Sequence, residues 1–277
     1  MFKIPRTFSY SSASMFKQCP RRWKHKYIDK LPDPAGEAAL IGTFAHDVLE
    51  QLCDEEPARR TEVKAKEIAG KSWAEFAEKK DFKNLKLDEE SQRAFRWQTW
   101  NAIQGLWQLE DPATIEVEAT EQKLSTSLSG VPFFGIVDRL DRNEDGITVV
   151  DYKTGKFNNE NIGQVLLYSA AVASETGEQP SKARLLYLGS KKKKIAPQIV
   201  ETDVSENRLT EVVEGLSDTW NKLKAHLKRE EFEPVPTPLC GWCSFITECE
   251  DGIKFIKKRA SLGKLRPDTP AKASLGL

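Results

Sequence analysis

Apolar residues recur at three- and four-residue steps through the first part of the chain, which is the spacing of one helix face. They predict a helix over residues 42–53 and a strongly helical stretch over 61–109, whose wide apolar face is expected in a core. A shorter helix is expected over residues 11–18, where serines can cap its first turn. Pro20 should end that helix or reset its direction.

After residue 112 the period of the pattern changes to two residues, as expected for strands. Strands are predicted over residues 115–117, 131–140, 147–151, 183–188 and 195–201. Helices are predicted over residues 160–174 and 204–229. Pro197 marks the last strand as an edge strand, with the lysines at 191–194 at the tip of the turn before it. This succession predicts an α/β fold with a central mixed sheet and helices before and after it.

Composition excludes two broad classes of protein. The 42 Lys and Arg residues balance 42 Asp and Glu residues, so the chain is neither a uniformly basic nucleic-acid coat nor an acidic disordered protein. Residues 15–30 and 251–277 each carry an excess of five positive charges, which suits DNA phosphates, although a solvated surface and a disordered tail also explain such charge. The longest apolar run, residues 165–173, is too short to cross a membrane, and the first residues lack a signal-peptide core. We therefore expect a cytoplasmic protein.

Two aspartates each follow an apolar strand run rather than a turn. Asp138 and Asp151 therefore leave neighbouring hydrophobic strands, where burial of a carboxylate is costly without a counter-charge. A divalent cation such as Mg²⁺ or Mn²⁺ prefers such hard oxygen ligands. Lys153 lies two residues beyond Asp151, so both side chains emerge on one face of a strand. Two carboxylates, a divalent cation and a lysine suit phosphoryl chemistry. The alternative is that the aspartates form ordinary salt bridges at the strand ends, beside a turn at Thr154 and Gly155.

Two helical pairs accompany these residues. His46 and Glu50 lie one turn apart on the helix predicted over residues 42–53. Gln164 and Tyr168 have the same spacing shortly after the lysine. Taken singly, each pair is more typical of an ordinary core or surface helix. Taken together with the aspartates and the lysine, they favour a functional constellation.

In chain order the motifs are Gly42-x3-His46-x3-Glu50, Gly135-Ile-Val-Asp138-Arg139, Val150-Asp151-Tyr152-Lys153-Thr154-Gly155 and Gln164-x3-Tyr168. With these motifs the sequence resembles the PD-(D/E)XK nuclease superfamily in its RecB-type branch, and is similar to the CRISPR-adaptation exonucleases and the AddB nuclease domain. The third motif has Asp151 where the superfamily more often has Glu. The resemblance implies a restriction-endonuclease-like core with a central mixed sheet flanked by helices, a helical N-terminal region and a C-terminal cysteine cluster.

The resemblance also implies roles for individual residues. The metal ligands would be His46, Asp138, Asp151 and the carbonyl group of Tyr152. Lys153 would position or polarise the attacking water. Gln164 and Tyr168 would line the DNA path and support the lysine. The resemblance assigns no role to Glu50.

Five cysteines include three within ten residues, Cys240, Cys243 and Cys249. An odd number without a secretion signal argues against disulfides, and the close spacing indicates a metal site in which Cys19 could be the fourth ligand. Four thiolates can bind zinc or an iron–sulfur cluster. The resemblance favours a [4Fe–4S] cluster. By the loop-closure relation, joining Cys19 to the C-terminal cysteines would stabilise the folded state by about 5 kcal/mol. Cys53 is expected to be a small buried apolar residue.

Two features of the helical stretch imitate functional motifs. The tryptophans Trp97, Trp100 and Trp107 could stack on bases, but their helical spacing is more typical of a core. The run from Gly70 to Ser72 resembles the end of a phosphate loop, but it lacks the first glycine and a preceding strand. We therefore expect no motor in this chain, and any helicase would be a separate polypeptide.

We expect a single nuclease domain over residues 1–262, with a helical insertion at about 54–112, and a flexible basic tail over 263–277. The predicted activity is that of a Mg²⁺- or Mn²⁺-dependent exonuclease. It would hydrolyse phosphodiester bonds in single-stranded DNA or at DNA ends, in recombination, repair, or phage- or CRISPR-type DNA processing. The alternative is a DNA-binding subunit of a helicase–nuclease or recombination complex, with vestigial or partner-dependent nuclease activity.

Overall fold

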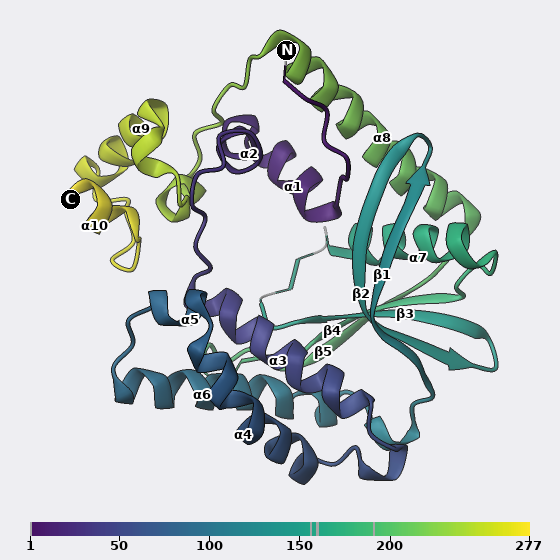
Figure 1. The fold of residues 1–277 in the computed structure, drawn as a ribbon. Helices are drawn as coiled ribbons and strands as arrows, with labels where there is room; N and C mark the ends of the chain where they lie inside the picture. The colour runs from purple at the N-terminus through teal and green to yellow at the C-terminus, as the bar shows by residue number, and fades with distance from the viewer. Residues whose placement is uncertain (1, 156, 159–160, 191) are drawn as a thin grey trace. The chain divides into compact units, whose positions relative to one another are not determined.

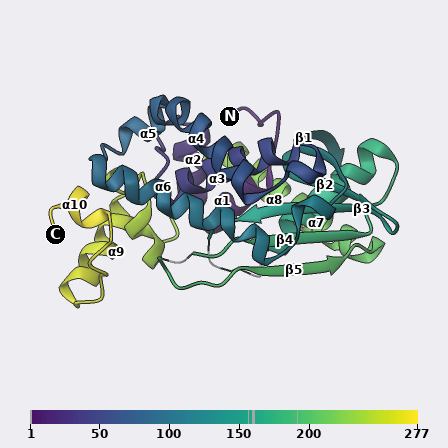
Figure 2. The same cartoon turned by 90° about the horizontal axis from the view of Figure 1, so that it is seen from below.

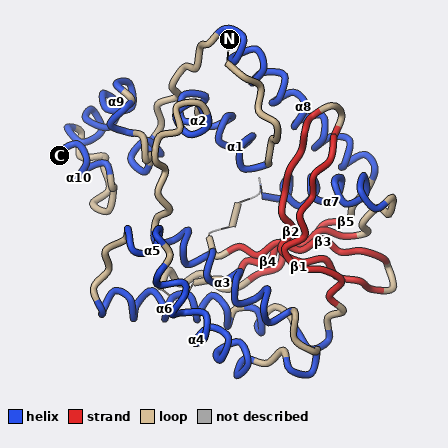
Figure 3. Tube along the Cα trace, in the orientation of Figure 1, coloured by secondary structure: helices blue, strands red, loops and turns tan. Residues whose placement is uncertain are grey.

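The computed structural model describes residues 2–155, 157–158, 161–190 and 192–277, which form two compact units. Unit 1 comprises Met1–Pro34 and Gly215–Leu277, and unit 2 comprises Ala35–Glu214. Both contribute to residues 1–262, for which the sequence predicts a single domain. The five strands of the sheet, drawn in red in Figure 3, all belong to unit 2.

Unit 2 is organised around a five-stranded sheet in the order β1-β2-β3-β4-β5 (Figure 1). The strands are β1 (Val117–Leu128), β2 (Val131–Asn143), β3 (Gly146–Lys153), β4 (Lys182–Tyr187) and β5 (Gln198–Asp203). Neighbouring strands are antiparallel except β3 and β4, which run parallel and are connected through helix α7 (Ile162–Thr176). As Pro197 predicts, β5 is an edge strand, and Figure 2 shows it beside β4.

The helices of unit 2 are α3 (Glu37–Cys53), α4 (Glu62–Glu78), α5 (Lys80–Asn84), α6 (Glu89–Gln104) and α7, with 3-10 turns at Pro57–Arg59, Leu106–Gln108 and Pro112–Thr114. Helices α3, α4 and α6 share one apolar core with Val150 and Tyr152 of β3 and Leu186 of β4. Lys153 alternates with Tyr152 along β3 and contacts α7, so helices cover both faces of the sheet. The predicted mixed sheet between helices is confirmed.

The largest difference from the predicted strands is the length of β1. The strand predicted over residues 115–117 instead begins at Val117 and continues to Leu128. Only Leu124 and Leu128 are buried along it, and polar residues fill most other positions. The apolar alternation that normally reveals a half-buried strand is therefore missing.

The predicted helices also shift at their ends. Helix α3 begins at Glu37 rather than at the predicted residue 42, so Gly42 lies inside the helix. The prediction of a core position is wrong for Trp97, which is 52% exposed, whereas Trp100 and Trp107 pack partly buried against the core. The start of the helix predicted over 160–174 and one lysine of the 191–194 run lie outside the described residues. Residues 192–194 form the predicted turn.

Unit 1 contains α1 (Tyr10–Gln18), α2 (Pro20–Tyr27), most of α8 (Glu206–Arg229), α9 (Glu250–Ser261) and α10 (Ala271–Leu275), with 3-10 turns at Pro238–Trp242 and Ile246–Glu248. Pro20 is the first residue of α2, so it resets the chain direction as predicted. Trp23 is 1% exposed, stacks on Phe232, and donates a hydrogen bond from Nε1 to Oγ of Ser12 at 2.9 Å. None of the helices in the described ranges combines the length and apolarity that a membrane span requires.

The C-terminal residues differ from the predicted flexible tail, because they contain α10. Ala271 is 2% exposed and packs in an apolar cluster with Ile246 and Ile256. Thr269 packs closely on Gly241, because a Cβ atom added to Gly241 would lie 2.5 Å from Cγ2 of Thr269. Contacts made by such small residues add little hydrophobic signal to the sequence, which explains why composition alone predicts disorder.

Candidate active site

Three carboxylates lie level with one another on the neighbouring strands β1, β2 and β3. The β1–β2 register places Glu121 opposite Asp138, between the pairs on either side. The β2–β3 ladder ends at Arg139 and Val150, so its next step places Asp138 level with Asp151. Like charges at adjacent positions of a sheet are destabilising unless a positive charge lies among them. The sheet therefore creates a site with strong demand for a cation.

Asp138 is held by groups from two other elements. Its Oδ1 atom lies 3.3 Å from Nδ1 of His46 on α3, and its Oδ2 atom accepts a hydrogen bond from the backbone N–H of Tyr152 at 2.6 Å. Burial disfavours the charged imidazole, but the contact with Asp138 outweighs this effect and raises the pKa of His46. At Gly42, helix α3 closely approaches the residue that follows β3, because a Cβ atom there would lie 3.0 Å from Oγ1 of Thr154.

Asp151 is paired with Lys153 on the same strand. Its side chain is 4% exposed, and its Oδ2 atom lies 2.5 Å from Nζ of Lys153. The two groups therefore form a close, largely buried ion pair. Burial and the neighbouring Asp138 raise the pKa of Asp151 to about 6, although Lys153 and His46 oppose the shift. The lysine alone therefore does not fully compensate the buried carboxylate.

A chain of hydrogen bonds on α7 fixes the lysine. Lys153 Nζ donates to Oε1 of Gln164 at 2.9 Å, and Nε2 of Gln164 donates to the hydroxyl of Tyr168 at 2.8 Å. Burial raises the pKa of Tyr168, which therefore stays protonated. The ring of Tyr168 lies over Gly135 on β2, where a Cβ atom would be 2.6 Å from Cε1. The glycine of the second motif thus makes room for the tyrosine of the fourth.

Glu121 is a member of this group that the sequence analysis missed. Its backbone has a φ of 44°, in the left-handed region that is uncommon for residues other than glycine, although the β1–β2 register is the same at Thr120 and Gln122 on either side of it. Burial, Asp138 and Glu50 raise the pKa of Glu121 to about 7. Glu50 thus lies near enough on α3 to act on Glu121 electrostatically. No apolar run or motif precedes Glu121, so only the strand register could have revealed it.

Arg139, the last residue of the second motif, makes its hydrogen bonds outside the group of Glu121, Asp138 and Asp151. It is 1% exposed and donates hydrogen bonds to Oε1 of Glu110 at 2.6 Å, to Oδ2 of Asp141 at 2.9 Å and to the hydroxyl of Tyr152 at 2.8 Å. Tyr152 Oη in turn lies 3.9 Å from Sγ of Cys53, which is buried as predicted. Removing one partner from such a buried network leaves an uncompensated charge, so it fixes the relative positions of β2 and β3.

The donor set of this group fits a divalent cation. His46, Glu121 and Asp138 each offer one ligand atom, and these three atoms lie within 4.8 Å of one another. Asp151 adds a buried carboxylate that is also ion-paired with Lys153. Carboxylate and imidazole ligands suit Mg²⁺ or Mn²⁺. The carbonyl group of Tyr152 as a ligand stays a prediction.

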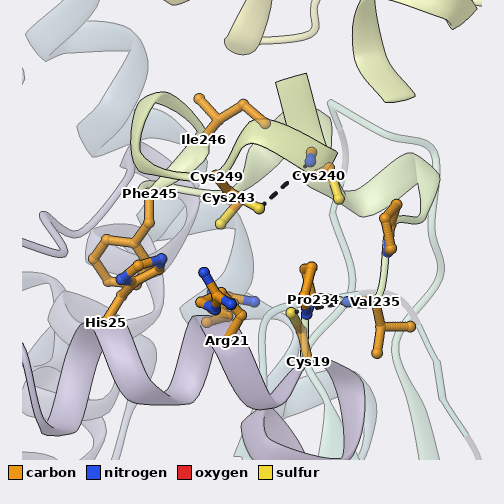
Figure 4. Close-up of a pocket in the computed structure, with 13 residues that line it drawn as sticks. Cys19, Arg21, His25, Pro234, Val235, Cys240, Cys243, Phe245, Ile246 and Cys249 are labelled. Atoms are coloured by element: carbon orange, nitrogen blue, oxygen red, sulfur yellow. Dashed lines mark hydrogen bonds between the residues drawn. The ribbon is translucent and has the colours of Figure 1, made fainter. Parts of the chain in front are cut away.

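A second group of predicted ligands lies in unit 1. Cys19, at the start of α2, lines one pocket with Cys240, Cys243 and Cys249, as Figure 4 shows. Backbone N–H groups donate to the sulfurs of Cys19, Cys240 and Cys249 at 3.4–3.5 Å. Burial raises the pKa of the Cys240 and Cys243 thiols, so without a metal these groups are neutral at pH 7.

Nitrogen-bearing side chains of α2 also line the cysteine pocket. Arg21 and His25 lie on the side facing the cysteine loop (Figure 4), and Arg22 lines the same pocket. The Nε atom of Arg22 is buried without a hydrogen-bond partner. The pocket thus combines four thiols with two guanidinium groups.

The fold and the site together define an α/β protein with an acid–lysine centre on a mixed sheet. The chain belongs to the PD-(D/E)XK nuclease superfamily, whose sequence profile matches residues 7–250. The predicted superfamily and the restriction-endonuclease-like fold class are thereby confirmed, whereas the RecB-type and AddB-like assignment stays a prediction.

Two solved structures are similar over most of their length. The "Putative exonuclease" of Eubacterium rectale has 15% sequence identity and a TM-score of 0.47, covering 86% of this chain and 87% of its own. The protein SSO0001 has 13% identity and a TM-score of 0.41, covering 90% of this chain and 89% of its own. No curated protein sequence matches the chain. The family assignment rests on the sequence profile.

Proposed function

We propose that the protein is a metal-dependent DNA exonuclease that hydrolyses phosphodiester bonds in single-stranded DNA or at DNA ends. The observation that carries the proposal is the convergence of Asp138, Asp151 and Lys153 with a histidine from α3, in a chain that belongs to a nuclease superfamily. The preference for single strands and ends, and a role in recombination, repair, or phage- or CRISPR-type processing, are proposed from the resemblance of the motifs to the RecB-type branch.

The proposed ligands of Mg²⁺ or Mn²⁺ are His46, Asp138, Asp151 and the carbonyl group of Tyr152. Such a cation, when bound, polarises the phosphate and lowers the pKa of a water molecule, which supplies the nucleophile at neutral pH. Lys153 would place its ammonium beside the negative charge that develops on phosphorus-bound oxygen. Gln164 and Tyr168 would hold the ammonium in one position, because their hydrogen bonds restrict its rotamers.

The cysteine pocket is proposed to hold a [4Fe–4S] cluster through Cys19, Cys240, Cys243 and Cys249. A tetrahedral zinc site is the alternative for the same four thiolates. Backbone N–H groups directed at the sulfurs are a usual feature of cluster ligands. The cluster would act as a structural staple between α2 and the C-terminal loops of unit 1.

The nuclease proposal is tested by digesting single- and double-stranded DNA labelled at either end, with Mg²⁺, with Mn²⁺ and with EDTA. Lys153→Ala and Asp151→Asn are expected to lower the rate by about 100-fold or more, because each removes charge stabilisation from the reacting centre. Lys66→Ala and Asp145→Asn are matched controls, since both side chains are exposed on the surface of unit 2. Circular dichroism and thermal unfolding check that all four variants fold.

Undiminished cleavage by either site variant would contradict the proposal. If the folded wild-type chain binds DNA but cuts none of the substrates with either metal, the DNA-binding subunit with partner-dependent or vestigial activity becomes the better assignment. The position of the label that is released first reports cleavage polarity and separates exonuclease from endonuclease activity.

A further inference from the structure

We propose that Glu121 is an additional ligand of the divalent cation, beside His46 and Asp138. The inference rests on the metal dependence proposed above and extends it to a residue outside the sequence motifs. It concerns a side chain of β1, the strand for which the sequence gives the weakest signal.

The first argument is the geometry of the three donors. One atom from each of His46, Glu121 and Asp138 lies within 4.8 Å of the other two. Octahedral ligands about 2.1 Å from Mg²⁺ are separated by about 3.0 Å when adjacent and about 4.2 Å when opposite. Small side-chain rotations would therefore bring the three atoms to bonding distance of one ion. The donors come from three elements, α3, β1 and β2, so the ion would connect them.

The second argument is charge. Three carboxylates, Glu121, Asp138 and Asp151, lie level on adjacent strands, and Lys153 supplies one fixed positive charge. Two negative charges remain, which a divalent cation would compensate. In the described part of the chain Glu121 makes no ion pair, although Asp138 lies directly opposite it. Without a cation, Glu121 at this position would lower the stability of the folded protein, because facing carboxylates repel.

The third argument is that Lys153 is already engaged by other groups. Its Nζ atom lies 2.5 Å from Oδ2 of Asp151, whose side chain is 4% exposed, and it donates a hydrogen bond to Oε1 of Gln164. The lysine therefore pairs with the carboxylate on β3 and does not pair with Glu121 on β1.

The test is a calorimetric titration of the purified full-length chain with MnCl₂ in the absence of DNA. Glu121→Gln keeps the size of the side chain but removes its charge, and it is expected to weaken Mn²⁺ binding by about tenfold or more. Glu121→Asp keeps the charge on a shorter side chain and should lose less affinity. Glu116→Gln is the matched control, because Glu116 is exposed just before β1, and its affinity should stay within about twofold of the wild type.

A second measurement separates a ligand from a merely structural residue. If Glu121 binds the ion, the increase in melting temperature on adding Mn²⁺ should shrink in Glu121→Gln, while the metal-free variant should be at least as stable as the wild type. Asp138→Asn serves as the positive control and should lose Mn²⁺ binding. Wild-type affinity in Glu121→Gln together with loss in Asp138→Asn would overturn the role of Glu121 and leave the proposed function standing. A wild-type chain that binds no Mn²⁺ would instead contradict the proposed metal dependence itself.

Discussion

At the scale of single residues, the site depends on close approaches that only glycine allows. Gly42 lets α3 bring His46 to Asp138, and Gly135 leaves room for the ring of Tyr168. The tyrosine then holds Gln164, which holds Lys153. The absence of a side chain at Gly42 and Gly135 therefore helps to position His46 and Lys153.

Gly135→Ala is expected to destabilise the protein by about 1–3 kcal/mol, because the new methyl group would lie 2.6 Å from the Tyr168 ring. Displacing that ring should also loosen Lys153 and lower kcat more than it raises KM. Urea unfolding and DNA digestion measure the two effects. Gly215→Ala is the control, because the Cβ atom there would contact nothing within 4 Å and should not destabilise the helix. Equal stability of both variants would contradict the packing argument.

At the scale of elements, the strand register and the helix positions assemble the site. The β1–β2 and β2–β3 ladders bring three carboxylates level, and α7 covers the lysine from one side of the sheet. On the other side, α3, α4 and α6 share an apolar core with β3 and β4. The chain leaves α6 at Gly105, which lies directly against the backbone carbonyl of Leu188 beyond β4.

Gly105→Ala should cost about 3 kcal/mol, since its Cβ atom would meet the Leu188 carbonyl oxygen at 2.0 Å and neither backbone can yield easily. Gly70→Ala provides the contrast within the same unit. Gly70 is exposed inside α4 with nothing within 4 Å of an added Cβ atom, so alanine should stabilise the protein by about 0.5–1 kcal/mol. Chemical denaturation of both variants measures the difference, and a stabilised Gly105→Ala would show that α6 can move away from the sheet.

At the scale of the whole molecule, the two units separate two kinds of chemistry. The carboxylates and the lysine all lie in unit 2, whereas the four clustered cysteines all lie in unit 1. Unit 1 is itself made from both ends of the chain, so a group bound by Cys19 and the C-terminal cysteines would tie those ends together. The basic residues of both ends belong to the same unit, although Lys24 and Lys26 are already paired with Asp29 and Asp33.

Anaerobically purified protein is expected to contain iron and acid-labile sulfide in equal amounts, near four of each per chain, and little zinc. Replacing Cys19 or Cys243 with serine should remove most of the iron and lower the melting temperature, because the staple is lost. Cys53→Ala is the control, since Cys53 lies in unit 2 and should leave the iron content unchanged. Stoichiometric zinc without iron or sulfide would contradict the cluster proposal.

The sequence by itself determined the features that follow local periodicity. The alternation around Asp138 and Asp151 places each at the end of an apolar run. Spacings of two and four residues put Lys153 beside Asp151 and Gln164 beside Tyr168, and the structure has both contacts. These relations depend only on strand and helix geometry, which residues near in sequence impose on one another.

The tertiary structure alone decided which distant residues meet. Glu121 faces Asp138 because of the register of a largely polar strand, and no pattern within β1 announces that register. Arg139 pairs with Glu110 inside the core, Trp97 lies at the surface, and α10 packs where composition predicts a flexible tail. Each outcome depends on which surface another element covers, and that is set by the packing of the folded chain rather than by its local sequence.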